Sequence, residues 1–250
     1  IISISQEVKI FMDKRNTLNL GFTLAEVLIT IGILGVLAAL TMPALIADKR
    51  GKELETGLKK NASVIAQALS LYQADTGTVL QPGDAADWKE LRDIFILKYF
   101  KVLRDCGRGY LNGECVLNNG WGADDNSKIY TTLNGNSLNL HLFDDGQYVL
   151  HDGSFILLEY STSSGTTELA VSDFFISVDV NGYNKKPNRL GQDLFTFQIT
   201  KEGKLLPMGA KGTKYSDDTY CSKTSTNNLN GIGCTYKAMT EPDYFKNLPK

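Results

Sequence analysis

A long apolar run extends from Phe22 to Ala47, and Glu26 is the only residue in it that carries a formal charge. A helix needs about 20 apolar residues to cross a membrane, so this pattern predicts a transmembrane helix. Gly32, Gly35 and Pro43 interrupt the run. Small residues let helices approach closely in lipid, and proline removes one backbone hydrogen bond.

A second apolar pattern follows at helical spacing. Residues recur at intervals of 4, 3, 4 and 3, at Leu58, Ala62, Ile65, Leu69 and Tyr72. This period predicts one buried helix face, and Asp75-Thr76-Gly77 is expected to end the helix. At 1.5 Å per residue, a helix from Phe22 to Tyr72 would be roughly 76 Å long. Its outer half, 48–75, is therefore expected to pack on a globular domain.

The remaining residues, 76–250, predict that domain. A second helix is expected from about Asp87, with Glu90 completing an acidic capping box. Its predicted buried face consists of Trp88, Leu91, Phe95, Tyr99 and Val102. From Ile129 onwards the pattern favours strands, most clearly within 155–160, 174–180 and 195–199. The predicted fold class is α+β, with the long N-terminal helix packed on an antiparallel sheet.

Composition and motifs narrow the functional class. The net charge is −2, and no basic run extends beyond Lys49-Arg50, so the composition does not favour a nucleic-acid surface. The sequence contains no G-x-S-x-G, P-loop or H-E-x-x-H motif. His141 and His151 lie ten residues apart with no acid or cysteine spaced to form a triad. We therefore predict that the chain is not an enzyme.

The four cysteines point to an oxidising compartment. Cys106 and Cys115 are nine residues apart, and Cys221 and Cys234 are thirteen apart. Local pairing is the simplest of three possible connectivities, and each bridge would contribute roughly 3 kcal/mol. Disulfides would place the domain outside the cytoplasm. A zinc site is the rival interpretation but lacks the usual C-x₂₋₄-C spacing, and free thiols are the third.

The residues at the start of the apolar run are the most informative about function. Gly21 is followed by Phe22-Thr23-Leu24, and Glu26 lies five residues after the glycine. A carboxylate within a membrane costs roughly 2.5–3.5 kcal/mol, so it needs a partner. These residues resemble the processing motif of the type IV pilins and the pseudopilins of type II secretion.

The resemblance implies roles for individual residues. A prepilin peptidase/methyltransferase would cut after Gly21 and methylate the new N-terminus at Phe22. Glu26 would pair with the amine of a neighbouring subunit during assembly. Pro43, 21 residues after Phe22, would lie where the helix loosens in the filament.

The same resemblance implies an organisation for the whole chain. Residues 1–21 would be a leader whose true start is Met12, 22–47 the membrane and assembly helix, and 76–250 an extracytoplasmic domain. The protein would reside in the inner membrane and then in a pilus or pseudopilus. Its partners would be other subunits, the inner-membrane assembly machinery and lipid. Such a filament could still bind DNA through a local patch of its surface. The alternative function is a single-span, membrane-anchored binding module that does not polymerise.

One loop has the composition of a cation site. Asp179, Asn181, Asn188 and Asp193 place oxygen atoms around Gly182 and Pro187, and calcium takes six to eight oxygens. The loop resembles the D-x-N-G…P-N…G-x-D loop of many prepilin-like proteins, which implies calcium as a cofactor. The alternative is a turn in which Asp and Asn bond their own backbone. Lys185 and Lys186 would repel a cation and favour the turn.

Overall fold

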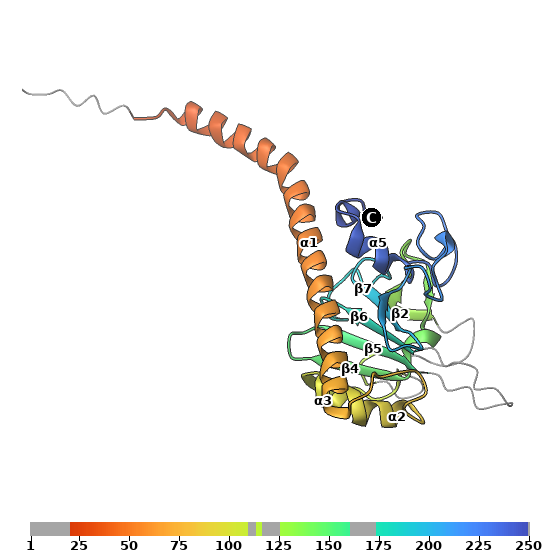
Figure 1. The fold of residues 1–250 in the computed structure, drawn as a ribbon. Helices are drawn as coiled ribbons and strands as arrows, with labels where there is room; N and C mark the ends of the chain where they lie inside the picture. Colours follow the sequence, from red (N-terminus) through yellow and green to blue (C-terminus); the bar gives the residue numbers. More distant parts are fainter. Residues whose placement is uncertain (1–20, 110–113, 117–125, 161–173, 250) are drawn as a thin grey trace, which may run out of the picture. The chain divides into compact units, whose positions relative to one another are not determined.

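The computed structural model describes residues 21–109, 114–116, 126–160 and 174–249 (Figure 1). The predicted leader start Met12 therefore lies outside the described residues. By its internal contacts the chain divides into two compact units, one ending at Ile46 and the other beginning at Ala47. Each unit is described by itself.

The first unit contains the apolar part of helix α1, which spans Leu24–Thr76 and includes Pro43. Its large apolar side chains are exposed, beginning with Leu24 at 81%, and so is Phe22 just before the helix. The hydroxyls of Thr30 and Thr41 donate to carbonyls of the preceding turn, so they need no water. One stretch of the helix is long and apolar enough to cross a membrane, although a signal sequence would meet the same criterion.

The second unit begins with the rest of α1, whose predicted buried face is confirmed. Leu58, Ala62, Ile65 and Tyr72 are buried, and Leu69 packs against the same core. The helix ends at Thr76, as predicted. Gly77 follows with φ 77° and donates its N–H to the Gln73 carbonyl, a helix ending that glycine adopts without strain.

The short helical segment begins as predicted but has a different buried face. It consists of α2 (Trp88–Leu91), a π-helical turn η1 (Arg92–Ile96) and α3 (Leu97–Tyr99). The Asp87 carboxylate accepts from the N–H groups of Lys89 and Glu90, and Glu90 accepts from the Ala86 N–H. These bonds confirm Asp87 as the N-cap, whereas Glu90 caps the N–H of Ala86 rather than that of Asp87, so the reciprocal half of the predicted capping box is displaced by one residue.

The predicted apolar face of this segment is partly wrong. The π-helical turn adds a residue, so adjacent Phe95 and Ile96 are both buried. Trp88 and Tyr99 are only half-buried, and Val102 belongs to the first strand rather than to the helix.

The centre of the second unit is a six-stranded antiparallel sheet in the order β1-β4-β5-β6-β7-β8. The strands are β1 (Val102–Asp105), β4 (Gly146–Leu150), β5 (Phe155–Tyr160), β6 (Phe174–Asp179), β7 (Leu194–Ile199) and β8 (Leu205–Pro207). A two-stranded sheet pairs β2 (Asn126–Thr131) with β3 (Ser137–Asn139). The remaining elements are η2 (Leu140–Phe143), η3 (Asp218–Tyr220), α5 (Cys234–Thr240) and η4 (Tyr244–Lys246). The α+β class is confirmed.

Both faces of the central strands are buried. Ile156, Leu158 and Ile176 share one core with the α1 side chains of this unit. Phe155, Leu157 and Phe175 belong to a second core with residues of β2, β3 and the C-terminal segments. Along β5 and β6 the alternation therefore separates two buried faces.

Candidate functional site

The predicted cleavage junction lies immediately before α1. Gly21, Phe22 and Thr23 precede the first helical residue, Leu24, and all four are exposed. Apart from Gly21 itself and its chain neighbours, no described atom lies within 4 Å of the position that a Cβ on Gly21 would take. Within the described part of the chain, this peptide bond is therefore open to approach.

Thr23 and Glu26 form a reciprocal cap at the start of α1. Glu26 Oε2 accepts from the Thr23 N–H at 2.8 Å and from the Thr23 hydroxyl at 2.8 Å. In return, the Glu26 N–H donates to Thr23 Oγ1 at 3.2 Å. This is a capping box, and a carboxylate here also complements the helix dipole. Thr23 was not singled out for this role, although its T-x-x-E spacing was readable from the sequence.

Pro43 lies inside α1 and does not end it. A loosened helix at this position in a filament stays a prediction.

The candidate cation residues come together in the hairpin between β6 and β7. Asp179 and Asp193 lie at the two ends of the loop, where the Val180 N–H donates to the Asp193 carbonyl at 2.9 Å. Asp179 Oδ2 accepts from the Tyr130 hydroxyl at 2.7 Å, and its Oδ1 accepts from the Gly182 N–H at 2.9 Å. The two Asp193 carboxylate oxygens accept from the N–H groups of Asn188 and Arg189. Both carboxylates therefore organise the loop, as in the turn interpretation.

The turn does not satisfy the side-chain oxygens of the two asparagines in the loop. Asn188 has φ 53° and donates its Nδ2 to the Tyr183 carbonyl at 2.7 Å. The side-chain oxygens of Asn181 and Asn188 are buried and accept no hydrogen bond from the described residues. A buried oxygen without a donor carries a free-energy cost. These two atoms are what a cation or a water would satisfy.

The charge of the β6–β7 hairpin depends on two buried carboxyl groups, those of Asp179 and Asp193. Burial, reinforced by the nearby Asp193 charge, raises the pKa of Asp179 to about 7. Burial also raises the pKa of Asp193 to about 6, against the opposing effect of the backbone N–H groups and Arg50. Lys185 and Lys186 are exposed. A bound cation would therefore relieve the repulsion of two ionised carboxylates, so charge and donor type fit calcium.

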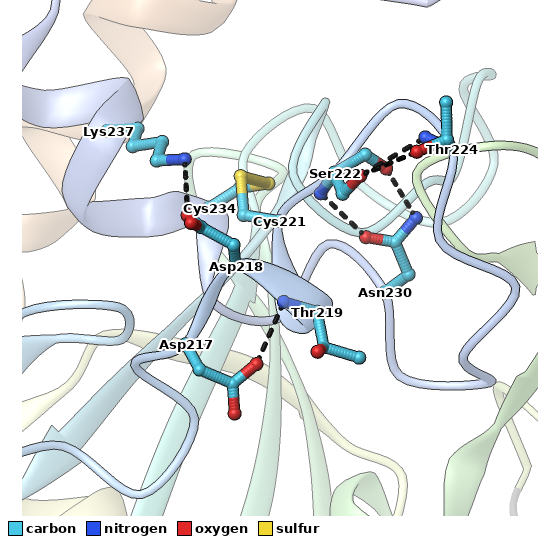
Figure 2. Close-up of polar contacts among 9 residues, drawn as sticks. All are labelled: Asp217, Asp218, Thr219, Cys221, Ser222, Thr224, Asn230, Cys234 and Lys237. Carbon is cyan, nitrogen blue, oxygen red and sulfur yellow. Dashed lines mark hydrogen bonds and ion pairs between the residues drawn. A yellow bond between two sulfur atoms is a disulfide. The ribbon is translucent and has the colours of Figure 1, made fainter.

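The cysteines pair as predicted. Disulfides join Cys106 to Cys115 and Cys221 to Cys234, which leaves no free cysteine in the chain. The second bridge ties the end of η3 to the start of α5 (Figure 2). Inside the loop that this disulfide encloses, Asn230 Oδ1 accepts from the Ser222 N–H, and Asn230 Nδ2 donates to the Ser222 carbonyl. These two hydrogen bonds hold the two sides of the loop together.

Comparisons with known protein families, with curated proteins and with solved structures give no match to this chain.

Proposed function

We propose that the chain is a prepilin-like structural subunit, processed after Gly21 and assembled into a helical filament through its N-terminal helix. The filament would be a type IV pilus or a type II secretion pseudopilus. Before assembly the protein would reside in the inner membrane, with the disulfide-bonded unit outside the cytoplasm.

One observation carries this proposal: a glycine junction is followed directly by the exposed apolar segment of α1, and the single acid of that segment, Glu26, lies in the first turn of the helix. Apolar side chains such as Phe22 and Leu24, more than 80% exposed, require lipid or other helices around them. Identical contacts that do not close on themselves generate an open helical assembly. A helix that keeps its apolar segment after cleavage could lie first in the lipid and then among the helices of neighbouring subunits.

The disulfides support the proposed location. Two bridges in one domain are characteristic of an oxidising compartment. Partners would then be the prepilin peptidase/methyltransferase, other subunits, the inner-membrane assembly machinery and, before assembly, lipid.

Processing provides the direct test. Wild type and Gly21→Ala are co-expressed with a prepilin peptidase, and intact mass and N-terminal sequencing define the mature chains. The wild type should begin at methylated Phe22, whereas Gly21→Ala should remain uncut. Gly35→Ala is the matched control, because it changes a glycine inside the apolar segment and should be processed normally. Equal processing of wild type and Gly21→Ala, or a cut elsewhere, overturns the proposal.

A single-span anchored binding module is the second candidate. The two buried asparagine oxygens of the β6–β7 hairpin favour it, because they are compatible with a ligand site. For that function the chain would keep the residues before Gly21 in the presence of the peptidase, and it would not enter sheared filaments.

A further inference from the structure

Three cations of the second unit lie together just beyond the apolar segment of α1. Arg50 is the third residue after Ala47, where the apolar run ends, and its side chain is exposed. Its guanidinium Nη2 donates to the backbone carbonyl of Lys186 in the β6–β7 hairpin. Lys185 precedes Lys186, and both side chains are exposed. We refer to Arg50, Lys185 and Lys186 as the basic cluster.

The hydrogen bond is supported by packing between α1 and the strands that flank the hairpin. Leu54 of α1 shares a hydrophobic core with Val178 of β6 and Phe195 of β7. At Gly57 the helix comes so close to Val180 that a Cβ on this glycine would lie 3.0 Å from the Val180 Cβ. The hairpin is therefore held beside α1 by buried contacts, and its lysines stay near Arg50.

Within the described part of the chain, the basic cluster forms no ion pair with a carboxylate. The two other cations at this level of α1 are paired, Lys52 with Asp48 at 3.1 Å and Lys49 with Glu53 at 3.7 Å. The uncompensated charge of this region is therefore that of the basic cluster.

One buried acid near the basic cluster does not neutralise it. The Arg50 charge acts on Asp193, but this residue is 0% exposed and its carboxylate accepts from the N–H groups of Asn188 and Arg189. Even with Asp193 ionised, three cations and one acid leave a net charge of +2. An exposed surface of one sign attracts ligands of the other sign.

The position of Arg50 in the chain sets its distance from the lipid. Three residues of helix advance about 4.5 Å along the axis. The headgroup region on each side of the hydrocarbon core is about 5–7.5 Å thick. When the apolar segment spans a membrane and the hydrocarbon core ends at Ala47, Arg50 lies at the depth of the phosphates. The hydrogen bond to Lys186 brings the lysines of the hairpin to the same surface.

This depth selects the partner. A guanidinium has more N–H donors than the Lys186 carbonyl occupies, so it can also bind a phosphate. Lysines near an anionic membrane add attraction that needs no fixed geometry. We propose that Arg50, Lys185 and Lys186 bind the phosphate groups of anionic phospholipids while α1 lies in the membrane. The inference rests on the proposed membrane residence of the chain, and not on its assembly into a filament.

Lipid binding to the full chain in mild detergent tests this inference. The protein is titrated with phosphatidylglycerol and, separately, with phosphatidylcholine, and native mass spectrometry counts the lipids bound. The wild type should prefer phosphatidylglycerol. Lys185→Gln/Lys186→Gln should lower that preference about fivefold or more, because one cation near an anionic surface is equivalent to about a factor of five in binding. Raising ammonium acetate from about 50 to 500 mM should weaken the preference, since salt screens exposed charges.

Two double variants serve as controls. Lys185→Arg/Lys186→Arg keeps both charges and should retain the preference of the wild type. Lys201→Gln/Lys204→Gln removes two exposed lysines from the turn between β7 and β8 and should also retain it.

Folding is checked by thermal unfolding of each protein. All variants keep the Lys186 backbone carbonyl that accepts from Arg50, so equal melting temperatures are expected. Where a double variant melts lower, Lys185→Gln alone decides the preference. The cations within residues 1–21 are present in every protein, so only differences between the proteins count.

Three results overturn the inference. One is a wild type that binds both lipids equally, and another is a Lys185→Gln/Lys186→Gln variant with the wild-type preference. The third is an equal loss in Lys201→Gln/Lys204→Gln, which would assign the effect to total charge. Gel retardation of duplex DNA is measured in parallel, and loss of DNA binding with an unchanged lipid preference would assign the lysines to nucleic acid instead. Each of these outcomes leaves processing after Gly21 unaffected, so the two proposals fail separately.

Discussion

The Thr23 hydroxyl and the Glu26 carboxylate are hydrogen-bonded at 2.8 Å across the first turn of α1. The only acid of the apolar segment is therefore satisfied within its own chain before any neighbour arrives. The amine of an incoming subunit would have to share or replace donors that Thr23 already supplies. This relationship makes Thr23, as well as Glu26, a determinant of how the helix begins.

Thr23→Val should fray the first turn of α1. The substitution keeps the β-branched shape and the backbone N–H but removes the hydroxyl, and loss of such a cap costs about 0.5–2 kcal/mol. Hydrogen exchange in detergent should show faster exchange at Glu26 and Val27, with no change in the second unit. Thr23→Ser keeps the hydroxyl and should match wild type. Equal exchange in all three proteins would show that the cap does not stabilise the helix.

Glu26 should be dispensable for insertion but needed for assembly. Glu26→Leu removes a carboxylate that is costly in lipid, so it should insert at least as well as wild type. Glu26→Gln keeps the shape and loses the charge, so it should enter sheared filaments about tenfold less, equivalent to roughly 1.4 kcal/mol. Quantitative immunoblotting of sheared and membrane fractions measures both effects. Wild-type incorporation of Glu26→Gln would show that charge pairing is not the mechanism.

The disulfide between Cys221 and Cys234 should stabilise the second unit. Its 13-residue separation corresponds to roughly 3 kcal/mol through restriction of the unfolded chain. A chain beginning at Ala47 contains both hydrophobic cores and is suitable for denaturant unfolding. The Cys221→Ala/Cys234→Ala double variant should unfold at lower denaturant concentration than wild type. Non-reducing peptide mapping should find each bridge within its own loop, and a crossed connectivity would contradict the structure.

Without a divalent cation, the second unit should lose stability as the pH rises. The folded-state pKa of Asp179, about 7, lies above its ordinary value of 3.8. The folded state then binds more protons than the unfolded state between about pH 4 and 7, so the free energy of unfolding decreases across that window. With Asp193 raised as well, the loss is on the order of a few kcal/mol.

Unfolding of the chain beginning at Ala47, measured in chelator from pH 4.5 to 8, checks this slope. Asp179→Asn should reduce the slope of the free energy of unfolding against pH, because that side chain no longer titrates. Asp144, whose pKa is also raised to about 7 by burial and by the Asp145 charge, would still contribute its own part of the slope. Parallel pH profiles for wild type and Asp179→Asn would rule out this role for Asp179.

Calcium at the hairpin should oppose that loss. At pH 7.5 a cation held by Asp179, Asn181, Asn188 and Asp193 would stabilise the folded state alone. The wild-type melting temperature should therefore rise in calcium relative to chelator, and Asp179→Ala should lose part of that rise. A rise of equal size in Asp179→Ala would place the responsible ion elsewhere, and no rise in wild type would leave the turn interpretation.

Local patterns were sufficient for several elements. The period of Leu58, Ile65 and Tyr72 fixed the buried face of α1, because side chains three and four apart share one side of a helix. Asp87 and Glu90 predicted a cap for the same reason, since the bonds that form it span four residues or fewer. The cysteine pairs were predictable because each lies within one short loop.

Other elements depended on contacts between distant parts of the chain. The edge strand β1 is only four residues long and carries no clear alternation, so its pairing with β4 defines it. The π-helical turn at Arg92–Ile96 shifts the buried face by a residue that no periodic pattern signals.

The sequence by itself determined the apolar helix, its single acid, the glycine junction and the cysteine loops, because each depends on residues near one another in the chain. Only the tertiary structure decided that both faces of β5 and β6 are buried and that Asp144, Asp145 and Glu159 meet. Strand register sets which side chains face each other, and a shift of one residue would turn Glu159 to the opposite face. Register depends on the packing of the whole sheet, so it is decided only when the chain folds.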